Sequence, residues 1–346
     1  MLIDWITAYL PMDKIPHEHW EAIRMMGDRV LRYCPRTGMK IWESSAWDSI
    51  RSDSHQISFR AGSDSIWIQG SPARVCGSGC AVFGEGAAVA LDLVGCLDRM
   101  ITFTSKQIGI ELSRDYKHWH VSRIDVTSNL MLDDLAAVRI ALRTLRECEG
   151  GRYRVSQQAG DTVYWSHKSR LRSGKAYAKG PHIDYMMKQP NYSGRIYSIE
   201  ERNLSNRILR LELKLGAQYL RERTDKPWFE LTRDDLTGEW RTYFERMIGA
   251  SEMTDESQLI DRINAVSDTP GKAKAAHSLF LLIQSQGWEK AKDLTSRRTW
   301  YRNLKILHAA GLGDADISAG NVVQLRRKVL ECSAVHSWAQ IISLAA

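Results

Sequence analysis

Three short segments of the sequence alternate between polar and apolar residues, and their polar residues are of types that can act on a phosphodiester. Alternate residues of a β-strand face opposite sides of a sheet, so each segment would present one polar face. In 208–215, for example, four leucines share one face. The three polar faces together hold one tyrosine, two carboxylates and several cations: Arg123, Asp125 and Thr127; Lys175, Tyr177 and Lys179; Arg210, Glu212 and Lys214.

Phosphodiester chemistry could use each of these groups. A tyrosine hydroxyl, with an ordinary pKa of about 10, is a poor nucleophile until a base or a cation favours its phenolate. Asp125 and Glu212 could hold a hard divalent cation such as Mg²⁺, and lysine or arginine could stabilise the charge that develops at the phosphoryl group. Each segment alone also fits an ordinary strand with a solvated face or a half-buried tyrosine, so the prediction depends on the combination.

Two histidines, His118 and His120, suggest a competing metal site. A histidine pair around one bulky apolar residue is the metal-binding pattern of HUH nicking endonucleases, and on a regular strand both rings would face one side. His120 would then share its face with Ile124 and Val126 rather than with Asp125. Only a β-bulge would let the histidines and Asp125 serve one metal. The alternative, which we favour, is an aromatic-rich strand entry.

The positive charge of the chain is concentrated in one segment. The whole chain has 48 Lys and Arg against 41 Asp and Glu, a formal charge of +7. Residues 152–195 alone have nine cations against two acids, which equals the entire excess. Such local charge indicates an anionic partner that docks there. The nine cations are Arg152, Arg154, Lys168, Arg170, Arg172, Lys175, Lys179, Lys188 and Arg195.

Composition excludes several classes of protein. A hydrophobic content of 43% and a charged content of 26% are typical of a globular chain, and 346 residues suggest two domains. No apolar run approaches the roughly 18 residues that a membrane span needs, and the first residues do not resemble a signal peptide. The scattered cysteines indicate reduced thiols in a cytoplasm: Cys34, Cys76, Cys80, Cys96, Cys148 and Cys332.

The elements that would position these residues are short strands and intervening helices. Because no long helix separates sequential strands, we predict an α+β fold with a largely antiparallel sheet. Strand-like runs occupy 3–10, 56–60, 65–69, 119–129, 162–167, 174–179 and 208–215. Helical spacing occupies 17–33 and 87–101, and a further helix opens at Asp133 and Asp134 and ends at Gly150-Gly151.

Helical patterns dominate after about residue 225. We therefore predict a catalytic domain at 1–224 and a mostly helical, DNA-binding domain at 225–346. Helices at 275–286, 288–294 and 297–310 suggest a helix-turn-helix, with Thr295-Ser296 able to cap the third. Leu304, Ile306 and Leu307 would pack inward. The third helix would expose a set of groups suited to a DNA groove: Arg297, Arg298, Arg302 and Asn303.

The order of several motifs resembles one known family, the replication initiators of filamentous phages (the gene II protein family), and more distantly the rolling-circle Rep proteins of plasmids. Six motifs keep the family's order over nearly the whole chain. They are residues 3–11 (IDWITAYLP), 70–75 with 82–84 (GSPARV and VFG), 121–127 (VSRIDVT), 176–179 (AYAK), 209–212 (LRLE), and 298–302 (RTWYR) with Leu307 and Ala310-Gly311.

The resemblance implies a phage protein that nicks and rejoins the plus strand at an origin to start rolling-circle replication. Tyr177 would attack the DNA, forming a 5′-phosphotyrosine and a free 3′-OH. Asp125 and Glu212 would hold Mg²⁺ or Mn²⁺, while Arg123 and Lys179 would sit beside the scissile phosphate. The family also implies a five-stranded, ferredoxin-like (HUH/Rep-like) catalytic domain.

The partners expected from this resemblance are the phage origin, single-stranded and duplex, and the host helicase and polymerase, in the host cytoplasm and with no membrane. Histidines are absent from this position in the best-known members, so His120 and, less readily, His118 remain alternative metal ligands. The cations expected to hold DNA are Lys175, Arg170, Arg172, Arg210, Arg297, Arg298 and Arg302.

Two other functions remain open. A non-catalytic DNA-binding regulator would need the C-terminal helices but not the set of Tyr177, Asp125 and Glu212. A histidine-metal hydrolase would be centred on the His118 and His120 pair. Within the nickase hypothesis, Tyr164 is a possible second nucleophile for strand joining, since it lies on the strand next to Tyr177.

Overall fold

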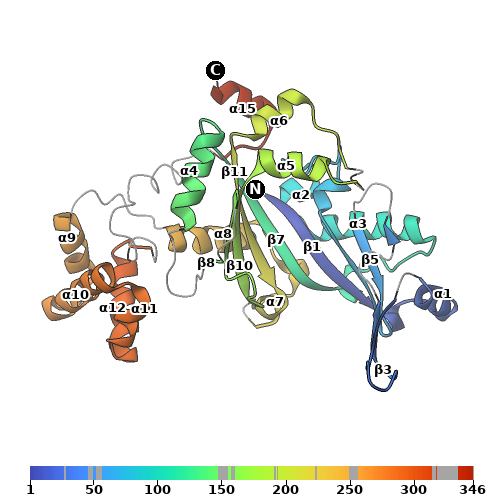
Figure 1. Ribbon diagram of the computed structural model, residues 1–346, viewed down its shortest axis with the longest axis horizontal. Coiled ribbons are helices and arrows are strands. Elements are labelled where there is room, and N and C mark those ends of the chain that lie inside the picture. The colour runs from blue at the N-terminus through green and yellow to red at the C-terminus, as the bar shows by residue number, and fades with distance from the viewer. Residues whose placement is uncertain are drawn as a thin grey trace.

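In the computed structural model, the described residues include an antiparallel sheet of nine strands at the centre of the protein (Figure 1). The structure describes residues 1–26, 29–45, 50–51, 57–146, 155–156, 160–190, 192, 194–222, 224–248, 256–313, 317 and 334–345. The strand order is β4-β5-β6-β1-β7-β11-β10-β9-β8. The strands are β1 (Leu2–Pro11), β4 (Ile50–Arg51), β5 (Ile57–Ala61), β6 (Ser65–Gly70), β7 (His120–Met131), β8 (Val155–Ser156), β9 (Thr162–Trp165), β10 (Arg172–Ala178) and β11 (Ile208–Gly216).

The α+β class with an antiparallel sheet is confirmed, although the described residues form nine strands in this sheet rather than the expected five. The hairpin predicted around 61–64 is β5 paired with β6. Several predictions lie outside the described residues: Gln56, Cys148, Gly150, Gly151, Arg152, Arg154 and Cys332.

One face of the sheet is buried under helices. The alternating apolar residues of β1, β7, β10 and β11 join one core with α3 (Leu93–Ile108), α4 (Leu135–Arg146) and α8 (Arg233–Ile248). In α3, the Asp92 side chain accepts a hydrogen bond from the Gly95 amide, and Gly109 ends the helix at φ 69°. The single helix predicted from 87 is interrupted, because Leu91 adopts φ 58° between α2 (Ala87–Ala90) and α3.

The opposite, polar face is covered at one end by α5 (Lys179–Met187), α6 (Ile199–Ser205) and the loop around Val82. A second small core forms there from Phe83, Tyr197 and Ile208 with the C-terminal helix α15 (Trp338–Ala345). Residue Val335 also donates its amide to the carbonyl of Asn129 in β7. The C-terminal segment therefore returns to the sheet and packs beside the polar face.

The helix predicted at 17–33 is wrong in its second half. A 3-10 turn (His17–His19) and α1 (Trp20–Arg24) are followed by β2 (Arg29–Tyr33), which pairs with β3 (Lys40–Ser45) in a separate hairpin. The remaining short elements are α7 (Ala217–Glu222) and 3-10 turns at Met12–Lys14, Pro72–Arg74, Tyr116–His118 and Trp228–Glu230.

A second group of helices follows α8 and has its own core (Figure 1). It comprises α9 (Glu256–Val266), α10 (Pro270–Gln286), α11 (Trp288–Asp293) and α12 (Arg297–Ala309), and the Ser296 side chain caps α12. Leu304 and Leu307 are buried there as expected. Asn303 is not exposed as predicted: it is 2% exposed and donates a hydrogen bond to the Ala275 carbonyl. A helix-turn-helix role for these helices stays a prediction.

The sequence predicts a domain boundary at residue 224, and this boundary stays a prediction. The packing of α8 is the structural observation closest to it. Leu236, Trp240 and Phe244 of α8 belong to the core of the sheet, whereas the second core begins at Leu259. The indole of Trp240 donates a hydrogen bond to the Leu211 carbonyl of β11. The packing therefore argues for a boundary after Ile248. Within the described residues, no helix is long and apolar enough to cross a membrane.

Candidate active site around Tyr177

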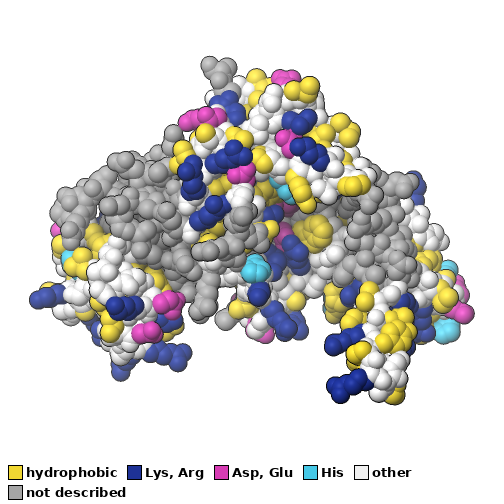
Figure 2. Space-filling model, in the orientation of Figure 1, with side chains coloured by type: hydrophobic (Ala, Val, Ile, Leu, Met, Phe, Trp, Pro, Cys, Tyr) yellow, Lys and Arg dark blue, Asp and Glu magenta, His cyan; other side chains and the backbone are white. Residues whose placement is uncertain are grey.

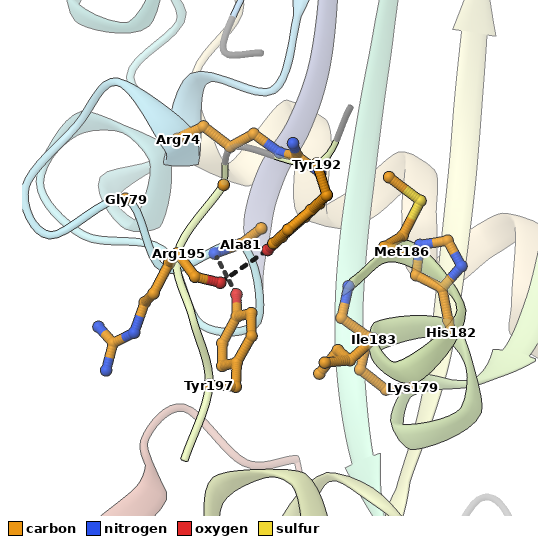
Figure 3. Close-up of a pocket in the computed structure, with 11 residues that line it drawn as sticks. Arg74, Gly79, Ala81, Lys179, His182, Ile183, Met186, Tyr192, Arg195 and Tyr197 are labelled. Atoms are coloured by element: carbon orange, nitrogen blue, oxygen red, sulfur yellow. Dashed lines mark hydrogen bonds between the residues drawn. The ribbon is translucent and has the colours of Figure 1, made fainter. Parts of the chain in front are cut away.

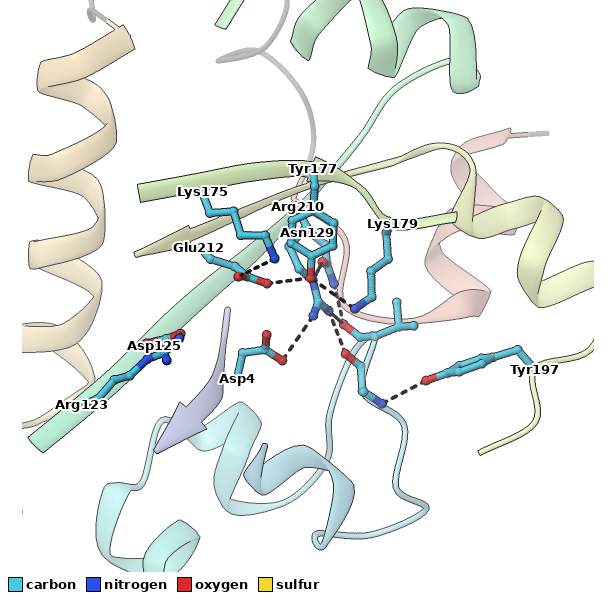
Figure 4. Close-up of polar contacts among 12 residues, drawn as sticks. Asp4, Arg123, Asp125, Asn129, Lys175, Tyr177, Lys179, Tyr197, Arg210 and Glu212 are labelled. Carbon is cyan, nitrogen blue, oxygen red and sulfur yellow. Dashed lines mark hydrogen bonds and ion pairs between the residues drawn. The ribbon is translucent and has the colours of Figure 1, made fainter. Parts of the chain in front are cut away.

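The three polar faces predicted from the sequence lie on one face of the sheet. In β10, β11 and β7, Tyr177 is opposite Arg210, which is opposite Asn129 (Figure 4). One step along the strands, Lys175 is opposite Glu212. Regular antiparallel pairing thus brings together side chains that are 81 residues apart in sequence, as in the hydrogen bond between Arg210 and Asn129.

The hydroxyl of Tyr177 contacts one carboxylate and one ammonium group, and a second ammonium group lies over its ring. It donates a hydrogen bond to Oε1 of Glu212 at 2.6 Å and accepts one from Nζ of Lys179 at 3.5 Å (Figure 4). Nζ of Lys175 lies 3.6 Å from Oε2 of Glu212 and 4.0 Å from the centre of the tyrosine ring. A nucleophile and its general base would need a direct contact of this kind.

Burial shifts the pKa values of the residues around Tyr177. The pKa of Tyr177 itself is raised well above its ordinary value by burial, and the neighbouring charge of Glu212 raises this pKa further. Burial also raises the pKa of Glu212, against the opposing effect of Lys175. The pKa of Lys179 is lowered by burial and then by Arg210. Tyr177 therefore keeps its proton at neutral pH until a base accepts it, and a carboxylate with a raised pKa is a better base.

Arg210, which the sequence predicts to hold DNA, is buried in the described part of the protein rather than exposed to a ligand. Its side chain is fully buried and forms an ion pair with Asp4 at 3.3 Å. It also donates hydrogen bonds to Oδ1 of Asn129 at 2.9 Å and to the carbonyls of Ala81 and Val82. A buried guanidinium with all these partners is a structural cation that fixes the loop at Ala81 and Val82 to the polar face of the sheet.

Sequence reasoning missed Asp4, which lies beside the same group of charges. A β-bulge between Ile3 and Trp5 adds one residue to β1 where it pairs with β7, so Asp4 is the extra residue there. Burial would raise the pKa of Asp4, but Arg210 and then Lys179 reverse the effect and lower it. Nothing in the alternation of the sequence signals this bulge. Asn129, by contrast, has the parity of Asp125 and was within reach of that reasoning.

Arg123 and Asp125 form a separate pair along the same face. The guanidinium donates two hydrogen bonds to the carboxylate, Nε to Oδ1 at 2.8 Å and Nη2 to Oδ2 at 2.5 Å. Burial raises the pKa of Asp125, with Arg123 opposing. Asp125 is opposite Lys214 on β11, one step along from Glu212 and two from the Tyr177 position.

The donor groups do not fit a metal ion in this arrangement. Both oxygens of Asp125 are bonded to Arg123, and both oxygens of Glu212 face Tyr177 or Lys175. Among the described residues, no group of three or more His, Cys, Asp or Glu is placed to hold a metal.

The two histidines are not on one strand. His118 ends a 3-10 turn, where its Nδ1 lies 2.9 Å from Oγ of Ser113 and its Nε2 lies 3.7 Å from Asp115. His120 begins β7 and stacks on Tyr9 at 4.8 Å. A second irregularity, where β7 has an extra residue opposite Thr7 and Ala8, turns His120 toward the polar face.

The other predicted DNA-binding cations have different surroundings. Arg172 is on the helix-covered face, where it pairs with Glu239 of α8 at 2.8 Å, so it is placed away from Tyr177. Arg170 is exposed in the turn before β10. Tyr164 lies opposite Lys175, whose ammonium is 5.7 Å from its ring. The three arginines of α12 are exposed: Arg297, Arg298 and Arg302.

A small cavity of about 30 Å³, which the sequence did not suggest, is lined by two residues that contact Tyr177 (Figure 3). Lys179 and His182 line it, and the imidazole of His182 packs edge-on against the Tyr177 ring at 4.9 Å. Burial and then Lys179 lower the pKa of His182 to about 2, so this ring is neutral. Two more cations line the cavity, Arg74 and Arg195. The cations of this lining suit a small anionic group.

Comparisons with known proteins identify the family. The family model for the N-terminal part of the gene II replication-associated protein matches residues 2–240. The replication-associated gene II protein of Enterobacteria phage I2-2 is 26% identical over 347 residues, which cover 95% of this chain and 93% of that protein. A solved structure of a rolling circle replication initiator protein from Geobacillus stearothermophilus aligns with 73% of this chain and 88% of its own, at 13% identity and a TM-score of 0.32. The residues matched by the family model include all of β1 to β11, so the chain belongs to the gene II family of replication-associated proteins.

Proposed function

We propose that this protein nicks one DNA strand with Tyr177 as the nucleophile and Glu212 as the general base. The hydroxyl oxygen would attack phosphorus, its proton would pass to Glu212, and the bond from phosphorus to the 3′ oxygen would break. The products would be a 5′-phosphotyrosine and a 3′-OH. The observation that carries the proposal is the 2.6 Å hydrogen bond from Tyr177 to Glu212.

The surrounding cations support the same chemistry. Lys175 and Lys179 lie on either side of the tyrosine and could stabilise the charge that develops on the phosphoryl oxygens. Lys179, with its lowered pKa, is a suitable donor of the proton that the leaving 3′ oxygen needs. Lys and Arg side chains gather across the middle of the surface that contains these strands (Figure 2).

Family membership supports a role in replication. Nicking at an origin would leave a 3′-OH that a host polymerase could extend while a host helicase unwinds the duplex, which is rolling-circle initiation. Rejoining would reverse the same step, with the 3′-OH attacking the phosphotyrosine. A requirement for Mg²⁺ or Mn²⁺ stays a prediction, and no step above depends on the metal.

A regulator that only binds DNA is the second candidate, because α12 exposes Arg297, Arg298 and Arg302. Such a protein would use these arginines to hold duplex DNA. It would have no use for a buried tyrosine in contact with a buried carboxylate, so we place it second.

Detection of a covalent adduct tests the proposal directly. The protein is incubated with labelled single-stranded DNA that carries the replication origin, in the presence of Mn²⁺, and the products are separated under denaturing conditions. We expect a labelled protein band with the natural chain and none with Tyr177→Phe. Tyr164→Phe is the matched control, because it removes a hydroxyl from the neighbouring strand and should leave the first nick unchanged.

An adduct that forms at the normal rate with Tyr177→Phe would show that another residue is the nucleophile. Loss of the adduct with Tyr164→Phe and not with Tyr177→Phe would assign the reaction to Tyr164. Tight duplex binding with no adduct under any condition would favour the regulator.

A further inference from the structure

Three aromatic rings form a continuous row across the polar face of the sheet. Trp67 of β6, Tyr9 of β1 and His120 of β7 are directly opposite one another in the strand register. The ring centres of Trp67 and Tyr9 are 4.6 Å apart, and those of Tyr9 and His120 are 4.8 Å apart with the planes only 19° from parallel. The guanidinium of Arg60 lies over the outer side of Trp67, 5.1 Å from its centre.

His120 ends this row and is exposed to solvent. The next strand, β11, ends at Gly216 opposite Arg123, so among the described residues no strand lies beside His120 on the side away from Tyr9. Without the extra residue in β7, the ring would point to the helix-covered face. The bulge therefore places an aromatic ring on the open end of a stack, where another flat ring could continue it.

Three cations, two of them paired with carboxylates of the same face, lie between this row and Tyr177. Along the polar face, Arg123, Lys214 and Lys175 follow one another from β7 to β10, and Arg123 also lies 5.3 Å above the ring of Trp5. By strand geometry, His120 is about 26 Å along β7 from the position level with Tyr177. A ligand that contacts both His120 and Tyr177 would have to be an extended polyanion with several repeating units.

We propose that the row of Trp67, Tyr9 and His120 is a base-stacking platform for single-stranded DNA, with one base stacked on His120. Arg123, Lys214 and Lys175 hold the intervening phosphates on the way to Tyr177. The platform deepens the proposed function, since its ligand is the strand that Tyr177 would attack. Alternating aromatic and cationic side chains along a surface are what single-stranded nucleic acid requires.

The proposal gives His120 a different role from the metal ligand predicted from the sequence. A stacking role requires a flat ring at this position and no nitrogen. A metal ligand requires the nitrogen. Replacing His120 with phenylalanine therefore separates the two roles, because phenylalanine keeps the ring and cannot bind a metal.

Equilibrium binding measures the platform without any cleavage. Fluorescein-labelled oligodeoxyadenylate of about 16 nucleotides is titrated with the full chain in a chelating buffer and followed by anisotropy. We expect His120→Ala to weaken binding by at least about fivefold, the lower end of what one lost base–aromatic contact costs, and His120→Phe to bind within about twofold of the natural chain. His17→Ala, which removes an exposed histidine that packs at a tilt against Trp20, should have no effect.

An oligomer of abasic deoxyribose phosphate keeps the charges and has no bases. We expect it to bind the natural chain and His120→Ala equally. The platform is overturned if His120→Ala binds oligodeoxyadenylate like the natural chain, if His120→Phe loses as much as His120→Ala, or if the abasic oligomer shows the same loss.

Failure of the platform and failure of the nickase are distinguishable. The binding assay contains no divalent cation and does not depend on Tyr177. A base-dependent loss with His120→Ala therefore supports the platform even if Tyr177→Phe still forms an adduct. Conversely, an adduct that depends on Tyr177, together with normal binding by His120→Ala, would support the nickase and contradict the platform.

Discussion

At the scale of single residues, the site combines a nucleophile that holds its proton with a base whose proton affinity is raised. Burial is the main cause of the raised pKa of Tyr177 and of the raised pKa of Glu212. The charge of Glu212 raises the pKa of Tyr177 further. In the free protein, Lys175 forms an ion pair with Glu212, and Lys179 donates a hydrogen bond to the Tyr177 hydroxyl. A phosphate that approaches these ammonium groups would compete with Glu212 for them, which would leave Glu212 a stronger base when substrate is present.

Replacing Glu212 with glutamine removes the base and keeps the shape of the side chain. We expect the single-turnover nicking rate to fall by at least about 100-fold, with little change in single-strand affinity. In the natural chain the rate should rise with pH as Glu212 loses its proton, and the raised pKa places this rise above the ordinary carboxyl range. Rates measured from acid to neutral pH check both points. A Glu212→Gln rate close to normal would exclude Glu212 as the base.

Replacing Asp4 with asparagine removes the charged partner of the fully buried Arg210. We expect the free energy of unfolding to fall by about 3 kcal/mol at neutral pH. The folded pKa of Asp4 is lowered, so its stabilising effect is complete above the unfolded value of about 4 and is lost as the pH falls through the folded pKa. Urea unfolding at neutral and acidic pH measures this, and the gap between the two proteins should narrow in acid. Equal stability at neutral pH would contradict the structural role of the pair.

At the scale of elements, the regular strands were predictable and the bulges were not. In β10 and β11 each residue alternates without interruption, so the faces of Tyr177, Glu212 and Lys175 followed from parity alone. Asp4 and His120 depend on one extra residue in β1 and one in β7, each of which shifts the parity. A bulge is fixed by pairing with a strand more than 100 residues away, and that information is absent from the local pattern.

The hairpin of β2 and β3 shows the same limit. Residues 17–33 have apolar spacing that fits a helix, yet Val30 and Leu31 are exposed and pair with Ser44 and Glu43. Local spacing predicts a helix only if the apolar side has a core to face. Here the helix ends at Arg24, and the following residues gain a pairing partner instead.

Replacing Gly174 with alanine tests whether α8 belongs to the sheet. A Cβ at this position in β10 would lie 2.6 Å from Cε1 of Tyr243 and 3.2 Å from Cε3 of Trp165, both on buried side chains. We expect a loss of about 1 to 3 kcal/mol in the free energy of unfolding, measured with urea. Gly238→Ala is the matched control, because a Cβ there meets nothing and helix propensity should add up to about 1 kcal/mol. A neutral Gly174→Ala would mean that α8 is not tightly packed there.

At the scale of the whole molecule, the sheet and the second helical group present separate cationic surfaces. The segment whose excess of cations equals the net charge of +7 has cations in different surroundings. Lys175 and Lys179 surround the tyrosine, while Arg172 is bound to Glu239 on the other face. The arginines of α12 lie in a unit with its own core, so duplex binding and nicking can be separated by mutation.

Replacing Arg298 with alanine should weaken duplex binding and leave cleavage of a short single strand unchanged. If Arg298 contacts a phosphate, the slope of log affinity against log salt should fall by about 1, because one fewer counterion is released. Titrations of origin duplex at several salt concentrations measure the slope, with Lys106→Ala on α3 as the exposed control. An unchanged slope and affinity would contradict a phosphate contact at Arg298.

The ion pair between Asp4 and Arg210 joins residues that are 206 positions apart, and the strand order explains what this means for synthesis. In the sheet, β1 is paired on one side by β6, but its other side must wait for β7, and β7 in turn for β11. A chain emerging from the ribosome would therefore have an unpaired, aggregation-prone strand edge during much of its translation. Such long-range pairing folds slowly, so the supply of chaperones and the pace of translation, rather than the stability of the finished protein, would set how much active protein is obtained.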